Sequence, residues 1–138
     1  MRPIIHLISS SILAIIIFIF TKSITASAII ILVGVFFDLD HLIDFWALKP
    51  ENAFNIKDFL DSEKYNKQAK YMFVLLHAYE WIIALWIISY LLNWPLYLLS
   101  ITLAISLHLI LDLNNLRYPN VHPLTYFISF RILRKFKK

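Results

Sequence analysis

The sequence predicts an all-α integral membrane protein, a bundle of four transmembrane helices with interfacial amphipathic segments. Of the 138 residues, 60% are hydrophobic and 16% are charged, whereas soluble domains average about 45–50% apolar and about 25% charged residues. The apolar residues form runs long enough for the helix of about 20 residues that a bilayer requires. The length is that of a single domain, so we expect residues 1–138 to form one membrane domain.

The first two spans are predicted at residues 3–20 and 24–45, separated by Lys22. A cleavable signal peptide is the alternative, because Ala26-Ser27-Ala28 resembles a small-residue cleavage site. The apolar stretch resumes at once after this point, which favours a span. Gly34, the one glycine in the sequence, is expected to allow close helix packing.

The third and fourth spans are predicted at residues 71–92 and 95–113, joined by a tight turn at Asn93-Trp94-Pro95. The polar connection before them, residues 49–70, mixes five lysines with four acids. Apolar residues at helical spacing within it predict a short amphipathic helix on the membrane surface.

The C-terminal tail, residues 124–138, alternates aromatic and apolar side chains with five cations and has no acid. This pattern predicts an interfacial helix attracted to an anionic membrane surface. A nucleic-acid surface carries similar charges, but the interleaved aromatic residues favour the membrane, so we expect no nucleic-acid partner.

Topology is predicted from the lysines and arginines, which gather in cytoplasmic loops. Arg2, the 49–70 connection and the 124–138 tail carry most of them and fall on one side, whereas Lys22 falls on the other. We therefore expect a protein of the cytoplasmic (inner) membrane with both termini cytoplasmic.

The ionisable groups within the predicted spans all fall at the cytoplasmic end. A charged residue at a helix centre costs about 2.5–3.5 kcal/mol on insertion scales, so such groups must pair, reach water or bind a cation. The chain has no cysteine, which leaves imidazole and carboxylate as ligands, a set that suits zinc, manganese, iron or nickel. The candidate metal ligands are His6, Asp38, Asp40, His41, His77, Glu80, His108 and Asp112.

Helical spacing sharpens this prediction. Three pairs each share one helix face, so three helices would each offer an imidazole and a carboxylate to a common centre, and His6 could add a ligand from the first helix. The pairs are Asp38 with His41, His77 with Glu80, and His108 with Asp112.

Several of these groups have structural alternatives. Taken alone, His6 is more often a hydrogen-bonded core residue, and Glu80 could pair with a histidine without touching metal. Asp40 and Asp44 form a second face, which could serve a second ion, a hydrogen bond to a ligating histidine, or the helix end. His122 lies in a loop and has no assigned role. A proton or ion pathway is the main competing interpretation of the whole set.

At these positions the chain resembles a family of inner-membrane metal-dependent hydrolases of unknown function, also described as LexA-binding inner-membrane-associated hydrolases. The resemblance rests on His6, the Asp38-Leu39-Asp40-His41 block, His77, and His108 four residues before Asp112. It extends to Tyr126-Phe127 and Arg131 in the tail.

Two departures from the family pattern stand out. Phe37 occupies a position where the family usually has proline, and Met72-Phe73-Val74 stands where it often has His-Arg-Gly. Glu80 could replace the missing histidine ligand. The family is in turn similar to zinc-dependent phospholipases C and single-strand nucleases, which cleave phosphoesters at a metal cluster.

We therefore expect a membrane-embedded metal-dependent hydrolase acting on a phosphoester or lipid-like substrate at the cytoplasmic leaflet. One or two divalent ions, with zinc as the first choice, would assist, and Asp40 or Asp38 would serve as the catalytic base. The alternative is a non-catalytic metal-binding or metal-transporting membrane protein. A third possibility is an assembly role, with the acids and histidines merely paired.

Overall fold

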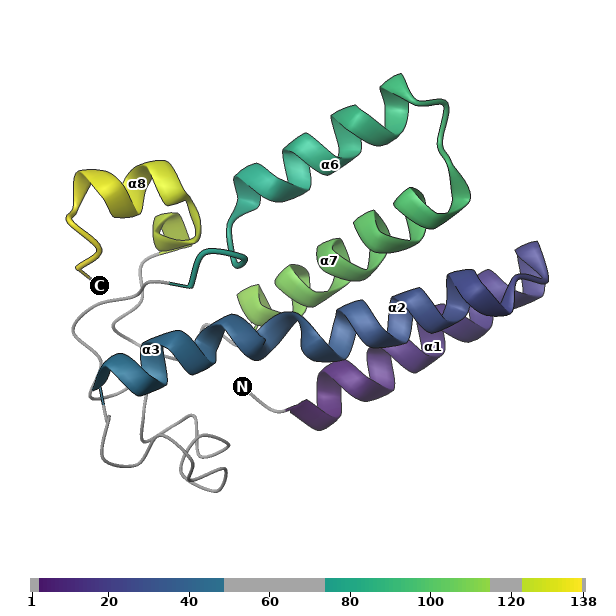
Figure 1. Cartoon of the computed structure of the whole chain (residues 1–138), viewed down its shortest axis with the longest axis horizontal. Coiled ribbons are helices and arrows are strands. Elements are labelled where there is room, and N and C mark those ends of the chain that lie inside the picture. The colour runs from purple at the N-terminus through teal and green to yellow at the C-terminus, as the bar shows by residue number, and fades with distance from the viewer. Residues whose placement is uncertain (1–2, 49–73, 115–122, 138) are drawn as a thin grey trace.

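The computed structural model of the chain describes residues 3–48, 74–114 and 123–137, and these residues are predominantly helical (Figure 1). Two long helices open the chain, α1 (Pro3–Thr21) and α2 (Ile24–Phe36). They run antiparallel as a hairpin, because Lys22 adopts a left-handed φ of 54° between them. Ser23 then caps α2 by accepting a hydrogen bond of 3.2 Å from the Ala26 N–H, as N-cap serines do.

Small residues let α1 and α2 approach closely. A Cβ built on Gly34 would lie 2.0 Å from the Ser10 Oγ and 2.9 Å from its Cβ, so only glycine fits this crossing. Further along, the Ser27 hydroxyl donates to the Ala14 carbonyl at 3.0 Å. This is the small-residue packing expected between helices in a membrane.

The second helix changes its winding where its acidic residues begin. A short 3₁₀ helix, η1 (Phe37–Asp40), follows α2 and leads into α3 (His41–Leu48). The 3₁₀ turn is tighter than an α turn, and it carries both Asp38 and Asp40. Phe37 at its start packs with Ile105 and Leu109 in one of the two buried apolar clusters.

A second antiparallel pair consists of α6 (Tyr79–Leu91) and α7 (Leu96–Asn114). The turn between them places Asn93 and Trp94 at left-handed φ values of 56° and 58°. Pro95 then precedes the first helical residue, and its carbonyl accepts from the Leu99 N–H at 2.9 Å. The predicted turn at residues 93–95 is therefore present, and α7 lies between α6 and the α1–α2 hairpin (Figure 1).

Three helical segments among the described residues are long and apolar enough to cross a membrane. The prediction of four spans is therefore confirmed in part: within the described part of the third, expected at 71–92, the helix is α6, with 13 residues. A helix of that length reaches about 20 Å, short of the ~30 Å of a bilayer core. The membrane-length segments are Ile4–Thr21, Ile24–Ile43 and Leu96–Leu113.

Residues 74–78, which the third predicted span includes, form a bent segment and not the first turns of a helix. The helix begins only at Tyr79, after an extended Ala78 with φ −132° and ψ 135°. The preceding residues run as a bent segment that brings His77 toward α7. Apolar composition alone could not distinguish this bent segment from the first turns of a helix.

The chain ends in η3 (Pro123–Tyr126) and α8 (Ile128–Leu133). In Figure 1, α8 lies beside the start of α6, where Tyr79 packs on Tyr126 and Phe127 with ring centroids 5.5 and 5.1 Å apart. The predicted interfacial tail is thus helical over residues 128–133. The predicted amphipathic helix in the 49–70 connection lies outside the described residues.

Candidate metal centre

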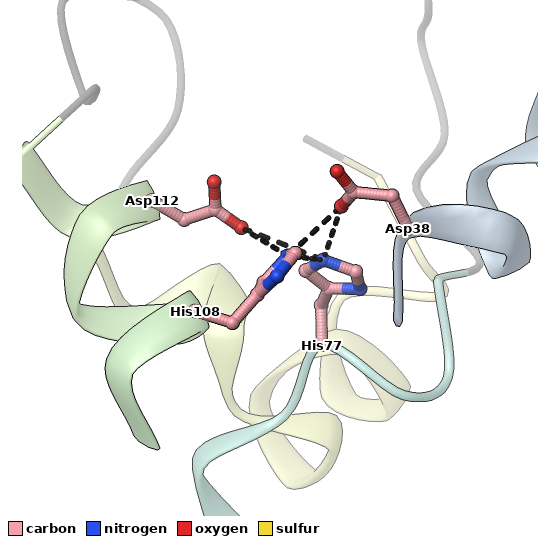
Figure 2. Close-up of side chains that lie close together, drawn as sticks. All are labelled: Asp38, His77, His108 and Asp112. Carbon is pink, nitrogen blue, oxygen red and sulfur yellow. Dashed lines mark hydrogen bonds and ion pairs between the residues drawn. The ribbon is translucent and has the colours of Figure 1, made fainter. Parts of the chain in front are cut away.

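Four side chains from three separate segments converge at one end of the helices: Asp38, His77, His108 and Asp112 (Figure 2). Asp38 comes from η1, His77 from the bent segment before α6, and the other two from successive turns of α7. One ligand atom from each lies within 4.8 Å of the others. The structure therefore brings together four of the predicted metal ligands.

The two imidazoles face each other with their Nε2 atoms 3.3 Å apart. The Asp38 Oδ1 lies 2.9 Å from the His108 Nε2 and 3.1 Å from the His77 Nε2. The Asp112 Oδ2 faces the same two nitrogens at 3.6 and 3.4 Å. Two nitrogens and two oxygens thus enclose one small volume.

The hydrogen-bond partner at Nδ1 of each ring determines whether the Nε2 that faces this volume carries a hydrogen or a lone pair. The His108 Nδ1 lies 2.9 Å from the Gly34 carbonyl, which can only accept, so this nitrogen must carry the hydrogen. The His77 Nδ1 lies 3.2 Å from the Asp40 Oδ2, a carboxylate that also accepts. Both Nε2 atoms of the neutral rings therefore direct lone pairs at the cluster.

Four acceptors consequently face one another. This arrangement is repulsive unless a cation lies between them or protons are added to the rings. The Asp112 Oδ2 is buried and has no hydrogen-bond partner among the described residues, as expected of a ligand atom lacking its ion. Two imidazoles and two carboxylates form a donor set that fits a divalent ion such as zinc.

The cluster is buried but not sealed. The side chains of His77, His108 and Asp112 are 1%, 1% and 4% exposed, whereas that of Asp38 is 15% exposed. Access therefore comes from the Asp38 side. Burial, with the negative charge of Asp112 next in importance, raises the pKa of the nearby Tyr126 hydroxyl, so this tyrosine adds no charge at neutral pH.

Asp40, one of the two predicted catalytic bases, lies behind His77. Its Oδ2 accepts from the Leu76 N–H at 2.9 Å and from the His77 Nδ1, while its Oδ1 lies 3.1 Å from that nitrogen outside hydrogen-bond geometry. A carboxylate holding the far nitrogen of a ligating histidine is a recurring feature of metal sites. Its contacts are those of a residue that orients His77.

His41 belongs to a second group that could hold a metal, together with Asp40 and His77. Its ring packs edge-on against that of His77 with centroids 4.6 Å apart. Its Nε2 is buried without a hydrogen-bond partner in the described part of the chain. Because the two groups share His77, they form adjoining layers of one cluster.

His6 flanks the cluster from α1. Its ring stacks on that of His108, with centroids 4.0 Å apart and planes 18° from parallel. Its Nε2 lies 3.4 Å from the Asp112 Oδ1, the oxygen opposite the one that faces the imidazoles. It thus contacts the second oxygen of a candidate ligand.

Glu80, the remaining predicted ligand, lies outside the cluster. Its carboxylate accepts from the backbone N–H groups of Ile128 and Ser129, both at 3.0 Å, and from the Ser129 hydroxyl at 2.9 Å. It therefore caps α8 and does not replace a histidine ligand. The Asp44 side chain and all of His122 lie outside the described parts of the structure.

Two further residues support the cluster and were not predicted to do so. The Gly34 carbonyl fixes the His108 ring, although the sequence indicated only helix packing. Arg131 is 1% exposed and contacts the segment that carries His77, although it was assigned to the membrane surface with the other tail cations. One signal was present: Arg131 lies between Phe130 and Ile132, whereas most other tail cations follow Leu133.

The fold and the cluster together define a helical protein with membrane-length spans and buried Asp and His groups that could hold a metal ion. Comparisons with models of protein families, with curated proteins and with solved structures find no match for the chain. The family resemblance of the sequence is therefore untested, and the function rests on the geometry of the cluster.

Proposed function

We propose that this chain is an integral membrane protein that binds a divalent ion, with zinc the first choice, and hydrolyses phosphoesters of lipid-like molecules. The observation that carries the proposal is the convergence of four acceptor atoms on one volume, with both imidazoles oriented by acceptors behind them. Asp38, His77, His108 and Asp112 would hold the ion. His41 and Asp40 would form the layer next to it.

The location of the cluster supports an amphiphilic substrate. It lies at the end of two of the membrane-length segments and near the start of the third, where water and lipid headgroups meet. The distribution of lysine and arginine assigns this end to the cytoplasm. In this proposal α6 completes a four-helix bundle as a fourth, shallower span, and the termini are cytoplasmic.

The tail supports the same location. Ile132 and Leu133 are 58% and 82% exposed, and Arg134, Lys135 and Lys137 are also exposed. An apolar edge beside cations suits a helix lying on an anionic membrane surface. We propose that α8 rests on the cytoplasmic leaflet next to the cluster.

The exposure of the two carboxylates indicates which one takes part in proton transfer and which one orients a ligand. A bound divalent ion would supply Lewis-acid polarisation of the phosphoryl group and acidify a water molecule. Asp38 is the most exposed carboxylate of the cluster, so it is the one placed to take the proton of that water. Asp40 remains a carboxylate that accepts the hydrogen of the His77 Nδ1, and it thereby holds the ring in the orientation that ligation requires.

The test is a turnover screen of the zinc-loaded protein against phospholipids, lipid phosphates and generic phosphodiesters. We expect metal-dependent turnover that is lost in Asp38→Asn while part of the zinc remains bound, because the amide oxygen can still ligate the ion but cannot serve as a base. Ser106→Ala is the control, because Ser106 lies on α7 outside the cluster and accepts a hydrogen bond from the Trp86 indole of α6. Zinc binding without turnover on any of these substrates would refute the hydrolase.

A non-catalytic metal site is the second candidate, and one observation favours it. Four protein ligands are enough to complete the tetrahedral shell of a structural zinc ion. Cobalt absorption separates the two candidates, because a four-coordinate site absorbs much more strongly than one with added water. A tetrahedral spectrum that phosphate or phosphate esters do not perturb would indicate the structural or transport role.

A further inference from the structure

We propose that α8 positions His77, and that Arg131 is the residue through which it acts. This inference rests on the proposed metal-binding function, since it concerns how one ligand is held. It assigns to the C-terminal helix a role inside the protein in addition to its role at the membrane surface.

The segment that carries His77 lacks regular backbone support. Residues 74–78 precede α6, and among the described residues two hydrogen bonds hold their N–H groups: the Ala78 N–H donates to the Leu76 carbonyl at 2.9 Å and the Leu76 N–H to the Asp40 carboxylate. Buried carbonyl groups in such a segment need donors from elsewhere in the fold. The donors determine where the His77 ring lies.

Arg131 supplies them. Its guanidinium donates to the carbonyl of Val74 through Nη1 and to that of His77 through Nη2, the latter at 3.1 Å. The two carbonyls lie on either side of the bend that carries Leu76, and the second belongs to the candidate ligand His77 itself. A planar guanidinium can donate to both at once, which a lysine ammonium does less well.

The contact is reciprocal. While Arg131 reaches from α8 to the His77 segment, Glu80 reaches from the start of α6 to the first N–H groups of α8. Glu80 follows His77 by three residues, so both contacts brace the same short stretch. Tyr79 packs on Tyr126 and Phe127 between them.

The orientation of His77 follows from this bracing. Asp40 holds the ring at Nδ1, but a ring can ligate only if its backbone is also fixed. Loss of Arg131 would leave two buried carbonyls without these donors and free residues 74–78 to move. The Nε2 of His77 would then spend less time beside that of His108.

The experiment compares Arg131→Met and Arg131→Lys with wild type, and uses Arg134→Met as the matched control. Arg134 directly follows α8 as its C-cap residue and is exposed, with its guanidinium over the Phe130 ring, so its loss removes the same charge from the tail. Two quantities are measured in micelles: hydrogen exchange of the Leu76 and Ala78 amides without metal, and the affinity and visible spectrum of bound Co²⁺.

We expect faster exchange at both amides in Arg131→Met and Co²⁺ binding weakened by about 10- to 100-fold, the usual effect of removing a group that orients a ligand. The spectrum should shift as one imidazole is lost. Arg131→Lys should recover part of both effects, and Arg134→Met should match wild type. Glu80→Gln, which loosens the contact from the other side, should change both quantities in the same direction by less.

The proposal is overturned if Arg131→Met exchanges and binds Co²⁺ as wild type does, or if exchange rises while affinity and spectrum stay unchanged. If Arg131→Met does not fold, Arg131→Lys and Glu80→Gln decide by the same criteria. If wild type binds no Co²⁺, the proposed function fails, and amide exchange alone decides whether Arg131 holds the segment.

Discussion

Buried polar side chains have different kinds of hydrogen-bond partner in the two halves of α7. In the first half, the Ser100 hydroxyl donates to the Leu96 carbonyl and the Thr102 hydroxyl to that of Leu98, both at 2.9 Å. In the second half, His108 and Asp112 direct acceptor atoms at each other and at residues of two other segments.

The difference separates structure from function. A hydroxyl can return its hydrogen to its own helix, so Ser100 and Thr102 are satisfied locally and require no ligand. A neutral imidazole already hydrogen-bonded at Nδ1, or a carboxylate, has only lone pairs left to offer. Buried polar residues indicate a binding site where their acceptors converge without donors, and helix packing where they do not.

The largest expected effect tests the comparison directly. His108→Ala removes a candidate ligand, and we expect zinc affinity to fall by more than about 100-fold, beyond the usual effect of losing a group that only orients a ligand. Thr102→Val changes a residue of the same helix that is equally buried and should leave the affinity within about twofold. Competition with a chromophoric chelator measures both. Equal losses in the two variants would remove the distinction between the halves.

Asp40→Asn is expected to have the next largest effect. The asparagine oxygen can still accept from His77, but the charge that stabilises the orientation is gone, so zinc affinity should fall by about 10-fold or somewhat more. Chelator competition measures this affinity, and thermal unfolding in the same micelles checks that the fold is kept. An affinity as low as that of His108→Ala would place Asp40 among the ligands themselves.

Much of the cluster could be predicted from the sequence, because its residues share one depth in the spans. Of the three predicted pairs, only His108 and Asp112 both enter the four-residue cluster, because His77 precedes α6 and Glu80 contacts α8. His77, His108, Asp112 and Asp38 were all predicted ligands, and the structure places them together. Spacing could not reveal that Asp40 lies behind His77. That relation depends on the 3₁₀ turn of η1 and on a contact with a segment 36 residues away.

Gly34→Ala probes the packing on which the cluster depends. The new methyl group would overlap Ser10, so we expect a loss of about 1–3 kcal/mol in the free energy of unfolding, as in other overpacked interiors. Zinc affinity should also fall, because the Gly34 carbonyl orients His108. Unfolding in mixed micelles gives the first quantity, and chelator competition gives the second.

Ser10→Gly provides the control, since it removes the atoms that the methyl group meets. In the double variant, part of the lost stability should return relative to Gly34→Ala alone. A Gly34→Ala variant as stable as wild type would contradict the close approach of α1 and α2.

The misassigned residues show what sequence patterns leave out. Glu80 and Arg131 were assigned by the local pattern, as a ligand next to His77 and as a membrane cation, yet their partners lie 48 to 57 residues away in sequence. The described part of the predicted third span begins without a helix for a related reason. Residues 74–78 are apolar like a helix, but long-range hydrogen bonds hold them bent.

The smallest effect is expected in the first half of α7. Ser89→Ala removes the 3.1 Å contact between the Ser89 and Thr102 hydroxyls, and hydrogen bonds between membrane helices are worth about 0.6 kcal/mol on average. Thr102 keeps its bond to Leu98, so zinc binding should not change. An effect on zinc affinity would show that the two halves are coupled.

Whether the cluster is a metal centre is tested by the zinc content of the purified protein after dialysis, measured by mass spectrometry beside Ser89→Ala and His108→Ala. We expect a fixed, stoichiometric zinc content in wild type and Ser89→Ala, and its loss in His108→Ala despite a retained helical fold. Wild-type protein that retains no more zinc than His108→Ala, even after incubation with excess zinc, would show that the converging histidines and aspartates are held by protons and are no metal centre.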